Sequence, residues 1–426
     1  MRVLQSLYAF AGNAPPQLAV TRQLVGRGHE VLVLGHEAAR VRIEASGATL
    51  RPFRLAYPDM DLARPETDPI RDWEPRTQLG AARRFRDRAL IKPMANATTE
   101  TAQVMAEWAP DIVVLDFLLV GVATAAEAAG IPAVVLVHCP YPFPTAGVPP
   151  FGSGWPMPKG RLSRALQGVG RRAVNRFFRP VTKRANAVRA SHGLAAVRDW
   201  TDQLLGAERV LVLTAAELDF AGQAALPANV RYVGPAFEPS AETWTSPWPS
   251  GDEDPLIVVS LSTSFMDQVG LAGRVLEAVA PLPARVLFTT GPAVDPAGLT
   301  IPANTRVGSY IPHRSVLPDA SVMVTHAGWQ TVNASLSCGV PLVCIPCGRD
   351  QPDNARRVVA AGAGITVRKS ATASRIRTAV SEALADRGLR ERAGRMASLL
   401  GRQDGAVAAT DEIESVLAAR GHLTFD

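Results

Sequence analysis

The chain has 426 residues, of which 47% are apolar, with a mean hydropathy of +0.07 and a formal net charge of +6. This length exceeds the size at which one hydrophobic core stops growing, so we expect two domains. No apolar run approaches the ~20 residues needed to cross a bilayer. The first residues lack a small-residue cleavage site, so we read them as a strand and expect a cytoplasmic protein.

Short apolar runs alternate with helical patterns through the first half. Strands are predicted at residues 3–4, 31–34, 112–115, 133–137, 210–213 and 231–233, with a turn at 12–16 and a helix at 17–27. Runs without a polar face are typical of buried parallel strands. The first turn contains Gly12 but no G-x-G-x-x-G pattern, so a dinucleotide cofactor has little support.

Two polar residues follow predicted strands directly. Asp116 comes after 112–115, and His138 comes after 133–137. Because parallel α/β sheets bind ligands beyond the carboxyl ends of their strands, either residue is a candidate catalytic group. The competing readings are that Asp116 only caps a turn and that His138 is a core histidine with its hydrogen bonds satisfied.

Segment 151–190 contains ten Lys or Arg and no acidic residue, with apolar residues at roughly helical spacing. Nucleic acid or an anionic membrane surface could bind such a segment. We favour a basic amphipathic helical pair that roofs a cleft, because no base-stacking pattern or nucleic-acid motif accompanies the charge. We therefore expect no nucleic-acid partner.

The middle of the chain divides it into domains. Segment 237–254 is rich in Pro, Ser and acidic residues and has no periodicity, so we place a linker there. The predicted units are residues 1–236, 255–405 and a final helical segment at 406–426. Cys344 and Cys347 have C-x-x-C spacing, but they straddle the end of a predicted strand. We favour packing for them over a metal or redox site.

The most informative stretch is 322–364. Residues 322–324 predict a buried strand, which is followed by a turn through His326 and Gly328 and by a helix beginning near Gln330 and Thr331. A helix start has unpaired N–H groups and partial positive charge, which suit a diphosphate. His326 beside it can donate to a phosphate oxygen.

The next strand, at 340–345, leads into a polar loop. Asp350 and Gln351 lie in this loop, where strand ends face a crevice. A carboxylate and an amide side by side can bind several hydroxyls of one sugar ring. A phosphate site joined to a hydroxyl-binding pair predicts a nucleotide-sugar ligand. After the strand predicted at 256–261, Thr263 offers a hydroxyl that could reach the phosphates.

This ordered set resembles the nucleotide-sugar-dependent glycosyltransferases of the GT-B fold, shared by plant natural-product enzymes and bacterial antibiotic enzymes. The matching residues are His326, Gly328, Trp329, Thr331, Gly339, Val340, Pro341, Pro346, Asp350, Gln351, Asn354 and Ala355. The resemblance extends over nearly the whole chain and is most specific in the C-terminal half.

The resemblance implies two doubly wound Rossmann-like domains facing across a cleft, with the acceptor in the first and the donor in the second. It implies that Pro312 and His313 pack on the nucleotide base, and that the last helix crosses back to the first domain. The family commonly needs no metal, and no Asp-x-Asp triplet is present, so we expect neither metal nor cofactor.

The chain departs from the family at its usual base. The resemblance places a histidine in the first strand-to-helix turn, held by an aspartate, but Asn13 stands there. An amide cannot take a proton near neutral pH. Three accounts remain open. Asp116 or His138 is the base, or the acceptor ionises easily, or the protein binds the donor without transfer. Asn13 can still orient the acceptor.

A second departure concerns the ribose. Where family members using UDP-sugars commonly carry glutamate, this chain has Ala334. Loss of that contact should weaken ribose binding by about 1.5–3 kcal/mol. Because deoxyribose lacks one of the two hydroxyls, we expect a preference for a dTDP-activated sugar, in particular a deoxysugar.

The leading prediction is an inverting, antibiotic-type transferase that attaches this sugar to an aromatic or polyketide-like aglycone. The proline- and aromatic-rich loop 140–151 suits such an acceptor, although it also reads as an ordinary surface loop. The alternatives are a UDP-sugar transferase acting on a macrolide or flavonoid, and a non-catalytic donor-binding partner of another transferase. The sequence leaves the sugar, the aglycone, the linkage atom and a homodimer open.

Overall fold

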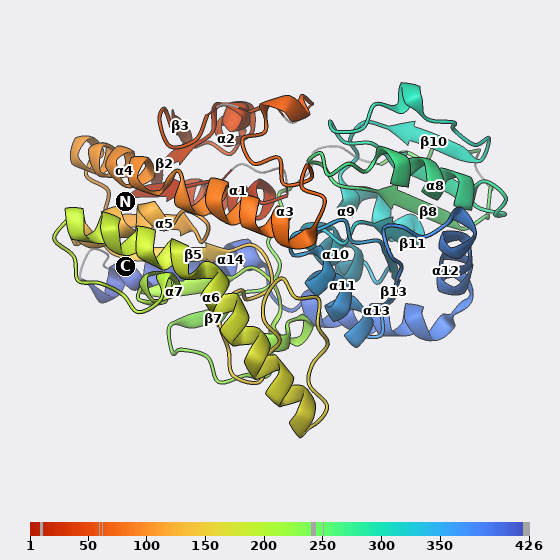
Figure 1. Cartoon of the computed structure of the whole chain (residues 1–426). Helices are drawn as coiled ribbons and strands as arrows, with labels where there is room; N and C mark the ends of the chain where they lie inside the picture. Colours follow the sequence, from red (N-terminus) through yellow and green to blue (C-terminus); the bar gives the residue numbers. More distant parts are fainter. Residues whose placement is uncertain (9–11, 59, 62, 240–243, 250, 421–426) are drawn as a thin grey trace.

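The computed structural model describes residues 1–8, 12–58, 60–61, 63–239, 244–249 and 251–420. Two parallel sheets with helices on both faces form two domains that lie side by side (Figure 1). The predicted α/β class with two doubly wound domains is confirmed. The predicted linker includes residues 240–243 and 250, which lie outside the described residues, and its described part forms no helix or strand.

The first sheet has the strand order β3-β2-β1-β4-β5-β6-β7, and every pair in it is parallel. Its strands are β1 (Arg2–Ser6), β2 (Glu30–Gly35), β3 (Thr49–Pro52), β4 (Ile112–Asp116), β5 (Ala133–Val137), β6 (Arg209–Val212) and β7 (Val230–Tyr232). The order reverses between β1 and β4, which is the switch point where such sheets bind ligands.

The second sheet repeats this plan with the order β10-β9-β8-β11-β12-β13. Its strands are β8 (Leu256–Ser260), β9 (Arg285–Thr289), β10 (Thr305–Gly308), β11 (Ala320–Thr325), β12 (Leu342–Cys344) and β13 (Gly364–Thr366). The corresponding switch point lies between β8 and β11.

The α-helices fill the connections between these strands. They are α1 (Ala14–Gly26), α2 (Arg40–Ala45), α3 (Gln78–Phe85), α4 (Met94–Trp108), α5 (Val120–Ala129), α6 (Arg161–Ser191), α7 (Trp200–Leu205), α8 (Val269–Val279), α9 (His313–Val316), α10 (Trp329–Ser337), α11 (Gln351–Ala360), α12 (Ala373–Ala385), α13 (Arg387–Leu400) and α14 (Gly405–Ala419). None of those in the described ranges is both long and apolar enough to span a bilayer.

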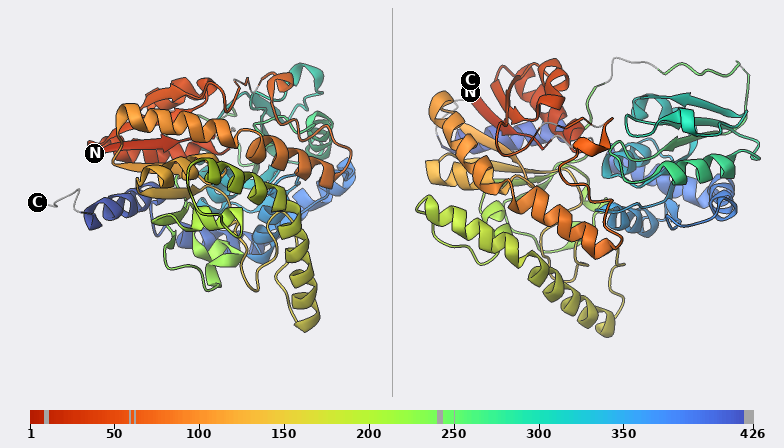
Figure 2. Two further views of the ribbon diagram at one scale, coloured as in Figure 1. Left: turned by 60° about the vertical axis from the view of Figure 1, so that its left-hand side comes forward. Right: turned by 45° about the horizontal axis from the view of Figure 1, so that its top comes forward.

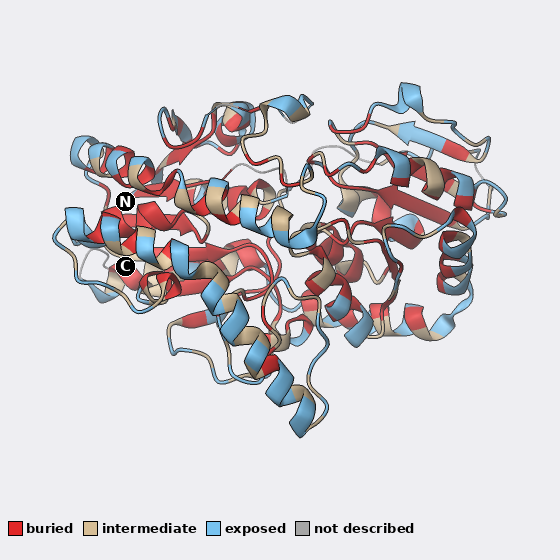
Figure 3. Ribbon diagram, viewed as in Figure 1, coloured by how far each residue is buried: buried red, intermediate tan, exposed pale blue. Residues whose placement is uncertain are grey.

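The central strands are apolar on both faces because helices cover both faces. In β4, Val113 and Leu115 join one buried cluster, whereas Ile112 and Val114 join the cluster on the opposite face. Figure 3 shows the central strands of both sheets as buried, whereas the edge strand β10 is largely exposed. Burial on both faces explains why the central strands read as continuous apolar runs rather than alternating patterns.

Two helices differ from the prediction. α1 begins at Ala14 rather than at 17, with prolines in its first turn. Proline is tolerated there because the first N–H groups of a helix have no partner within it. The predicted basic helical pair is wrong, since a single helix, α6, runs through Pro180 from Arg161 to Ser191.

The last helix returns to the first domain. α14 lies against α1, with Ala409, Ile413 and Leu417 in the core cluster of the first sheet (Figure 1). Glu414 on this helix pairs with both Arg27 and His29. Helix α14 therefore ties the second domain back to the first.

His36, at the end of β2, supports a prediction about acid stability. Its ring lies 5.4 Å from the ring of Tyr8, 6.4 Å from that of Phe53 and 5.3 Å from that of Tyr57. Neither of its ring nitrogens has a hydrogen-bond partner among the described residues. Burial lowers the pKa of His36 to about 4.

We expect stability to fall as the pH drops from about 6.5 towards 4, because the unfolded chain then binds a proton that folded His36 excludes. His36→Leu should reduce this fall by ~2–3 kcal/mol. Urea unfolding of both proteins at pH 7 and near pH 4.5 measures it. Equal losses of stability in the variant and the parent would contradict the prediction.

Candidate functional site

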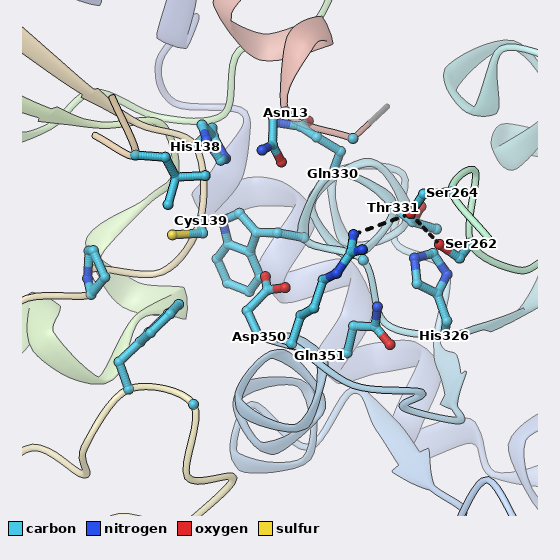
Figure 4. A pocket seen from close by; sticks show the side chains of 18 of the residues that line it. Asn13, His138, Cys139, Ser262, Ser264, His326, Gln330, Thr331, Asp350 and Gln351 are labelled. Carbon is cyan, nitrogen blue, oxygen red and sulfur yellow. Dashed lines mark hydrogen bonds between the residues drawn. The ribbon is translucent and has the colours of Figure 1, made fainter. Parts of the chain in front are cut away.

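A cavity of about 1050 Å³ lies between the two domains and is lined by residues of both. The two switch points open into it. Asn13 follows β1 and Ser262 follows β8, while His138 follows β5 and His326 follows β11, and all four residues line the cavity (Figure 4). The parallel register therefore gathers residues from both halves of the sequence at one site.

The predicted phosphate site is formed by His326 and the first turn of α10. His326, Gly328, Trp329, Gln330 and Thr331 all line the cavity. A β-carbon at Gly328 would lie only 2.5 Å from Nε2 of His326, so glycine leaves room for the imidazole in its present position against the helix start. The helix begins at Trp329, one residue before the predicted start, and presents its first N–H groups to the cavity.

His326 is neutral at physiological pH. Its side chain is only 9% exposed, and burial lowers its pKa to about 4. The ring would therefore act on a phosphate oxygen as a hydrogen-bond donor rather than as a cation. Positive potential at this site has to come from the start of α10 and from nearby guanidinium groups.

Hydroxyl groups from the loop after β8 lie near the predicted phosphate site. The predicted residue, Thr263, lines the cavity but is exposed. Its neighbours Ser262 and Ser264 are buried, and their hydroxyl oxygens lie 3.3 Å apart (Figure 4). The buried amide of Gln268 donates to the backbone oxygens of both serines and holds this loop in place.

The two residues of the predicted sugar-binding pair, Asp350 and Gln351, make different contacts. Asp350 lines the cavity and accepts from Asn354 through one carboxylate oxygen, at 2.8 Å. Gln351 also lines the cavity, but its side-chain oxygen accepts from the N–H groups of Cys347 and Gly348, and its nitrogen lies against the sulfur of Met266. Asp350 therefore faces the site, whereas Gln351 holds the loop that presents it.

The segment predicted to pack on the nucleotide base also borders the cavity. Pro312 precedes α9 and His313 begins it, and both line the same wall as Ala334 of α10. Arg314 stacks on the ring of Phe237, 4.6 Å from its centroid. No carboxylate occupies the position of Ala334, so this wall offers an aliphatic surface where the family resemblance expects an acid.

The first domain contributes an apolar wall. The lining aromatic residues are Phe85, Phe117, Tyr141, Phe143, Phe151, Phe177, Phe178 and Trp200. Loop 140–151 therefore borders the cavity rather than forming a remote surface loop. Large flat apolar side chains of this kind suit a hydrophobic or aromatic ligand.

The candidate bases Asp116 and His138 form a pair at the edge of this wall. Nε2 of His138 lies 3.2 Å from one carboxylate oxygen of Asp116 and 3.3 Å from the other. Asp116 is fully buried and also accepts from Gln17 at 2.7 Å, whereas His138 lines the cavity. The imidazole of His138 thus lines the cavity, and the carboxylate of Asp116 lies behind it, away from the cavity.

Asn13 caps the start of α1 and makes no side-chain hydrogen bond to the helix. Its backbone oxygen accepts from Gln17, the same amide that donates to Asp116. In Figure 4 the side chains of Asn13 and Gln330 reach into the cavity from opposite domains. Asn13 is therefore placed to contact a ligand but not to remove a proton from one.

One functional candidate escaped the sequence analysis. Arg349 makes a two-pronged ion pair with Asp72 of the first domain, at 2.8 Å for both contacts, and donates to Ser264 at 3.3 Å. Beside it, Trp73 and Phe265 pack edge to face across the domain boundary. The sequence does show a basic residue directly before Asp350, but its partner, Asp72, lies 277 residues away in the chain.

Helix α11 fastens the two domains at a second place. Arg357 forms an ion pair with Asp219 in which both side chains are almost fully covered. Asp219 also accepts from the backbone N–H of Tyr141 and from the hydroxyl of Tyr232. One turn earlier, Asp353 accepts from the backbone N–H groups of Gly152 and Gly154.

The cysteines and acidic residues do not form a metal-binding cluster in the described part of the chain. Cys344 and Cys347 are free and buried, and burial raises the pKa of Cys347 to about 11. Their positions fit packing beneath the loop that leads to Asp350.

Comparison with known proteins gives consistent results. Residues 273–403 match the family of erythromycin biosynthesis protein CIII-like C-terminal domains. The chain is 30% identical to 4'-demethylrebeccamycin synthase of Lentzea aerocolonigenes over 98% of its own length and 99% of that protein. It superimposes on the kitacinnamycin glycosyltransferase with a TM-score of 0.74, at 25% identity and with 97% and 98% of the two chains covered. With glycosyltransferase VinC in complex with dTDP, the TM-score is 0.70 at 20% identity, covering 99% and 100%.

Substitutions of the two residues in the Asp72–Arg349 pair are expected to have different effects on nucleotide binding. Arg349→Met should weaken binding of a nucleoside diphosphate about tenfold, because a charge-assisted hydrogen-bond donor is lost beside the phosphate site. Asp72→Asn should leave binding unchanged or make it tighter, because it removes an acid that competes with the phosphates for Arg349.

Calorimetric titration with dTDP measures both effects, and the exposed Arg368→Gln in the same domain serves as the charge control. Equal weakening by Arg349→Met and Asp72→Asn would mean that the pair acts only by joining the domains.

Proposed function

The chain belongs to the GT-B glycosyltransferases of natural-product biosynthesis, and we propose that it transfers a deoxysugar from a dTDP-sugar to an aromatic or polyketide-type aglycone. One observation carries the proposal. A single cavity joins the predicted phosphate site at α10 to an aromatic wall, and both His138 of the first domain and Asp350 of the second domain line it. Donor, acceptor and base can therefore meet in one space.

The donor side supports a nucleoside diphosphate as leaving group. As the bond to the anomeric carbon breaks, negative charge grows on the diphosphate. The first N–H groups of α10, neutral His326 and the hydroxyls of Ser262 and Ser264 surround the space proposed for it. Donors that are fixed before the reaction stabilise such charge without reorganisation. Asp350 would bind hydroxyls of the sugar ring.

The preference for dTDP rests on Ala334. Its side chain lines the cavity one turn into α10, near Pro312 and His313, where the base and ribose are proposed to lie. An aliphatic side chain cannot accept from the two hydroxyls of a ribose, and it loses less with deoxyribose. The structure of VinC, which has a similar fold, is a complex with dTDP.

The acceptor side supports His138 as the general base. The acceptor nucleophile would give its proton to Nδ1 of His138 while attacking the anomeric carbon from the face opposite the diphosphate, which inverts the configuration. Asp116 contacts Nε2 and would stabilise the imidazolium that forms. Gln17 holds Asp116 from behind and fixes the direction of the pair.

Transfer itself provides the test. Purified protein is incubated with dTDP-sugars, UDP-sugars and a panel of phenolic and polyketide acceptors, and the product mass and donor hydrolysis are followed. Glycosylated product supports the proposal. Tight dTDP binding without transfer or hydrolysis would instead support a non-catalytic donor-binding partner. The cytoplasmic location and a homodimer remain predictions.

His138→Asn should lower kcat by about 10²–10⁴ while leaving the Kd for dTDP unchanged, because it removes the proton acceptor but not the phosphate site. Asp116→Asn should lower kcat less, since the imidazole keeps its place on the wall. Asn13→Ala is the matched control on the other side of β4, and it should affect KM for the acceptor more than kcat. A His138→Asn enzyme with full kcat would reject the assignment.

The protein should bind dTDP more tightly than UDP. In Ala334→Glu the added carboxylate can accept from both ribose hydroxyls, so the dTDP-to-UDP affinity ratio should shift towards UDP by about tenfold. Competition of both nucleotides for the free protein measures the ratio, and circular dichroism checks that the larger side chain leaves α10 folded. Tighter binding of UDP by the parent protein would overturn the donor assignment.

A further inference from the structure

Helix α6 consists of two halves with different surroundings. After Pro180 it is packed into the first domain, and Val181, Ala185 and Val188 are buried. Before Pro180, only Gln167 is buried. The half at 161–179 projects beyond the rest of the molecule, as both Figure 1 and Figure 2 show.

The projecting half carries unpaired positive charge. Arg161, Arg164, Arg172, Arg176 and Arg179 are exposed, and none has an acidic partner within the part of the chain that the structure describes. Some half-exposed arginines elsewhere do have such partners, as Arg27 has Glu414 and Arg209 has Glu412. The first half of α6 is thus a cationic surface without an internal counterion.

An exposed apolar stripe runs beside these charges. Leu162 is 75% exposed, Leu166 57% and Val169 60%, and their spacing puts them on one side of the helix. Trp155, which is 41% exposed, packs against Gly170 of the same helix, where a β-carbon would lie 2.8 Å from its ring. Figure 3 shows this end of α6 as largely exposed.

The stripe leads to the cavity. Further along the helix, Ala173, Val174 and Phe177 line the cavity wall. An apolar molecule at the tip of α6 could therefore follow a continuous apolar path into the acceptor side of the site. This continuity relates the outer surface to the reaction.

We propose that the first half of α6 binds an anionic lipid surface. A bilayer offers anionic headgroups and, below them, an apolar layer, which match the exposed arginines and the adjacent stripe of Leu162, Leu166 and Val169. Nucleic acid would satisfy the charge but would leave three aliphatic side chains in water. Docked in this way, the enzyme would take apolar acceptors directly from the membrane.

The test is co-sedimentation of the full chain with phosphatidylcholine vesicles that contain increasing fractions of phosphatidylglycerol. The lipid variant is Arg161→Gln, Arg164→Gln, Arg172→Gln and Arg176→Gln combined. The matched control is Arg368→Gln, Arg375→Gln, Arg387→Gln and Arg395→Gln, which removes the same charge from exposed sites of the second domain. A second variant, Leu162→Ser, Leu166→Ser and Val169→Ser, removes the stripe alone.

We expect the parent and the control to bind anionic vesicles, and the partition coefficient of both α6 variants to be lower by at least about tenfold. Binding of the parent should weaken at high salt, and brominated lipids should quench Trp155, an effect lost in Trp155→Phe. Equal binding to neutral and anionic vesicles, or equal loss in the control, would overturn the proposal. Two results together would also overturn it. These are release of the protein from vesicles by duplex DNA or an acidic protein, and no quenching of Trp155 by brominated lipids.

Discussion

The buried ion pair between Arg357 and Asp219 is the contact on which the geometry of the site depends. Two charges removed from water are stable only when they are paired and hydrogen-bonded, so these side chains permit little sliding of one domain over the other. Asp219 meets this requirement with Arg357, Tyr232 and the backbone of Tyr141. The cavity therefore exists as a defined space rather than as a loose gap.

The same pair connects the two halves of the chemistry. Arg357 lies on α11, the helix that begins directly after Asp350, while Tyr141 lies three residues after His138. The proposed sugar contact, Asp350, and the proposed base, His138, are thus each close in sequence to a residue that takes part in this buried interaction. The buried pair therefore restricts changes in the separation of these two groups, which lie in different domains.

Groups that local sequence pattern controls were predictable from the sequence, whereas contacts made only in the folded chain were not. His326, Gly328 and the helix after them were predictable because a strand, a turn and a helix start lie within a few residues. The predicted sugar-binding residue Gln351 also holds a neighbouring loop through its side-chain oxygen, and only the folded backbone shows this contact. The partner of Arg349 lies in the other domain, and the segment predicted as a helical pair is one helix that continues through Pro180.

The replacement of the expected histidine by Asn13 has a topological explanation. In the first sheet, β4 lies between β1 and β5, so a residue at the end of either neighbouring strand can reach Asp116. The family resemblance places the base after β1, whereas here the imidazole comes from β5 and Gln17 of α1 occupies the other side of the carboxylate. The Asp–His contact survives because the carboxylate is central. Its imidazole lines the cavity together with the aromatic wall, where we propose that the acceptor binds.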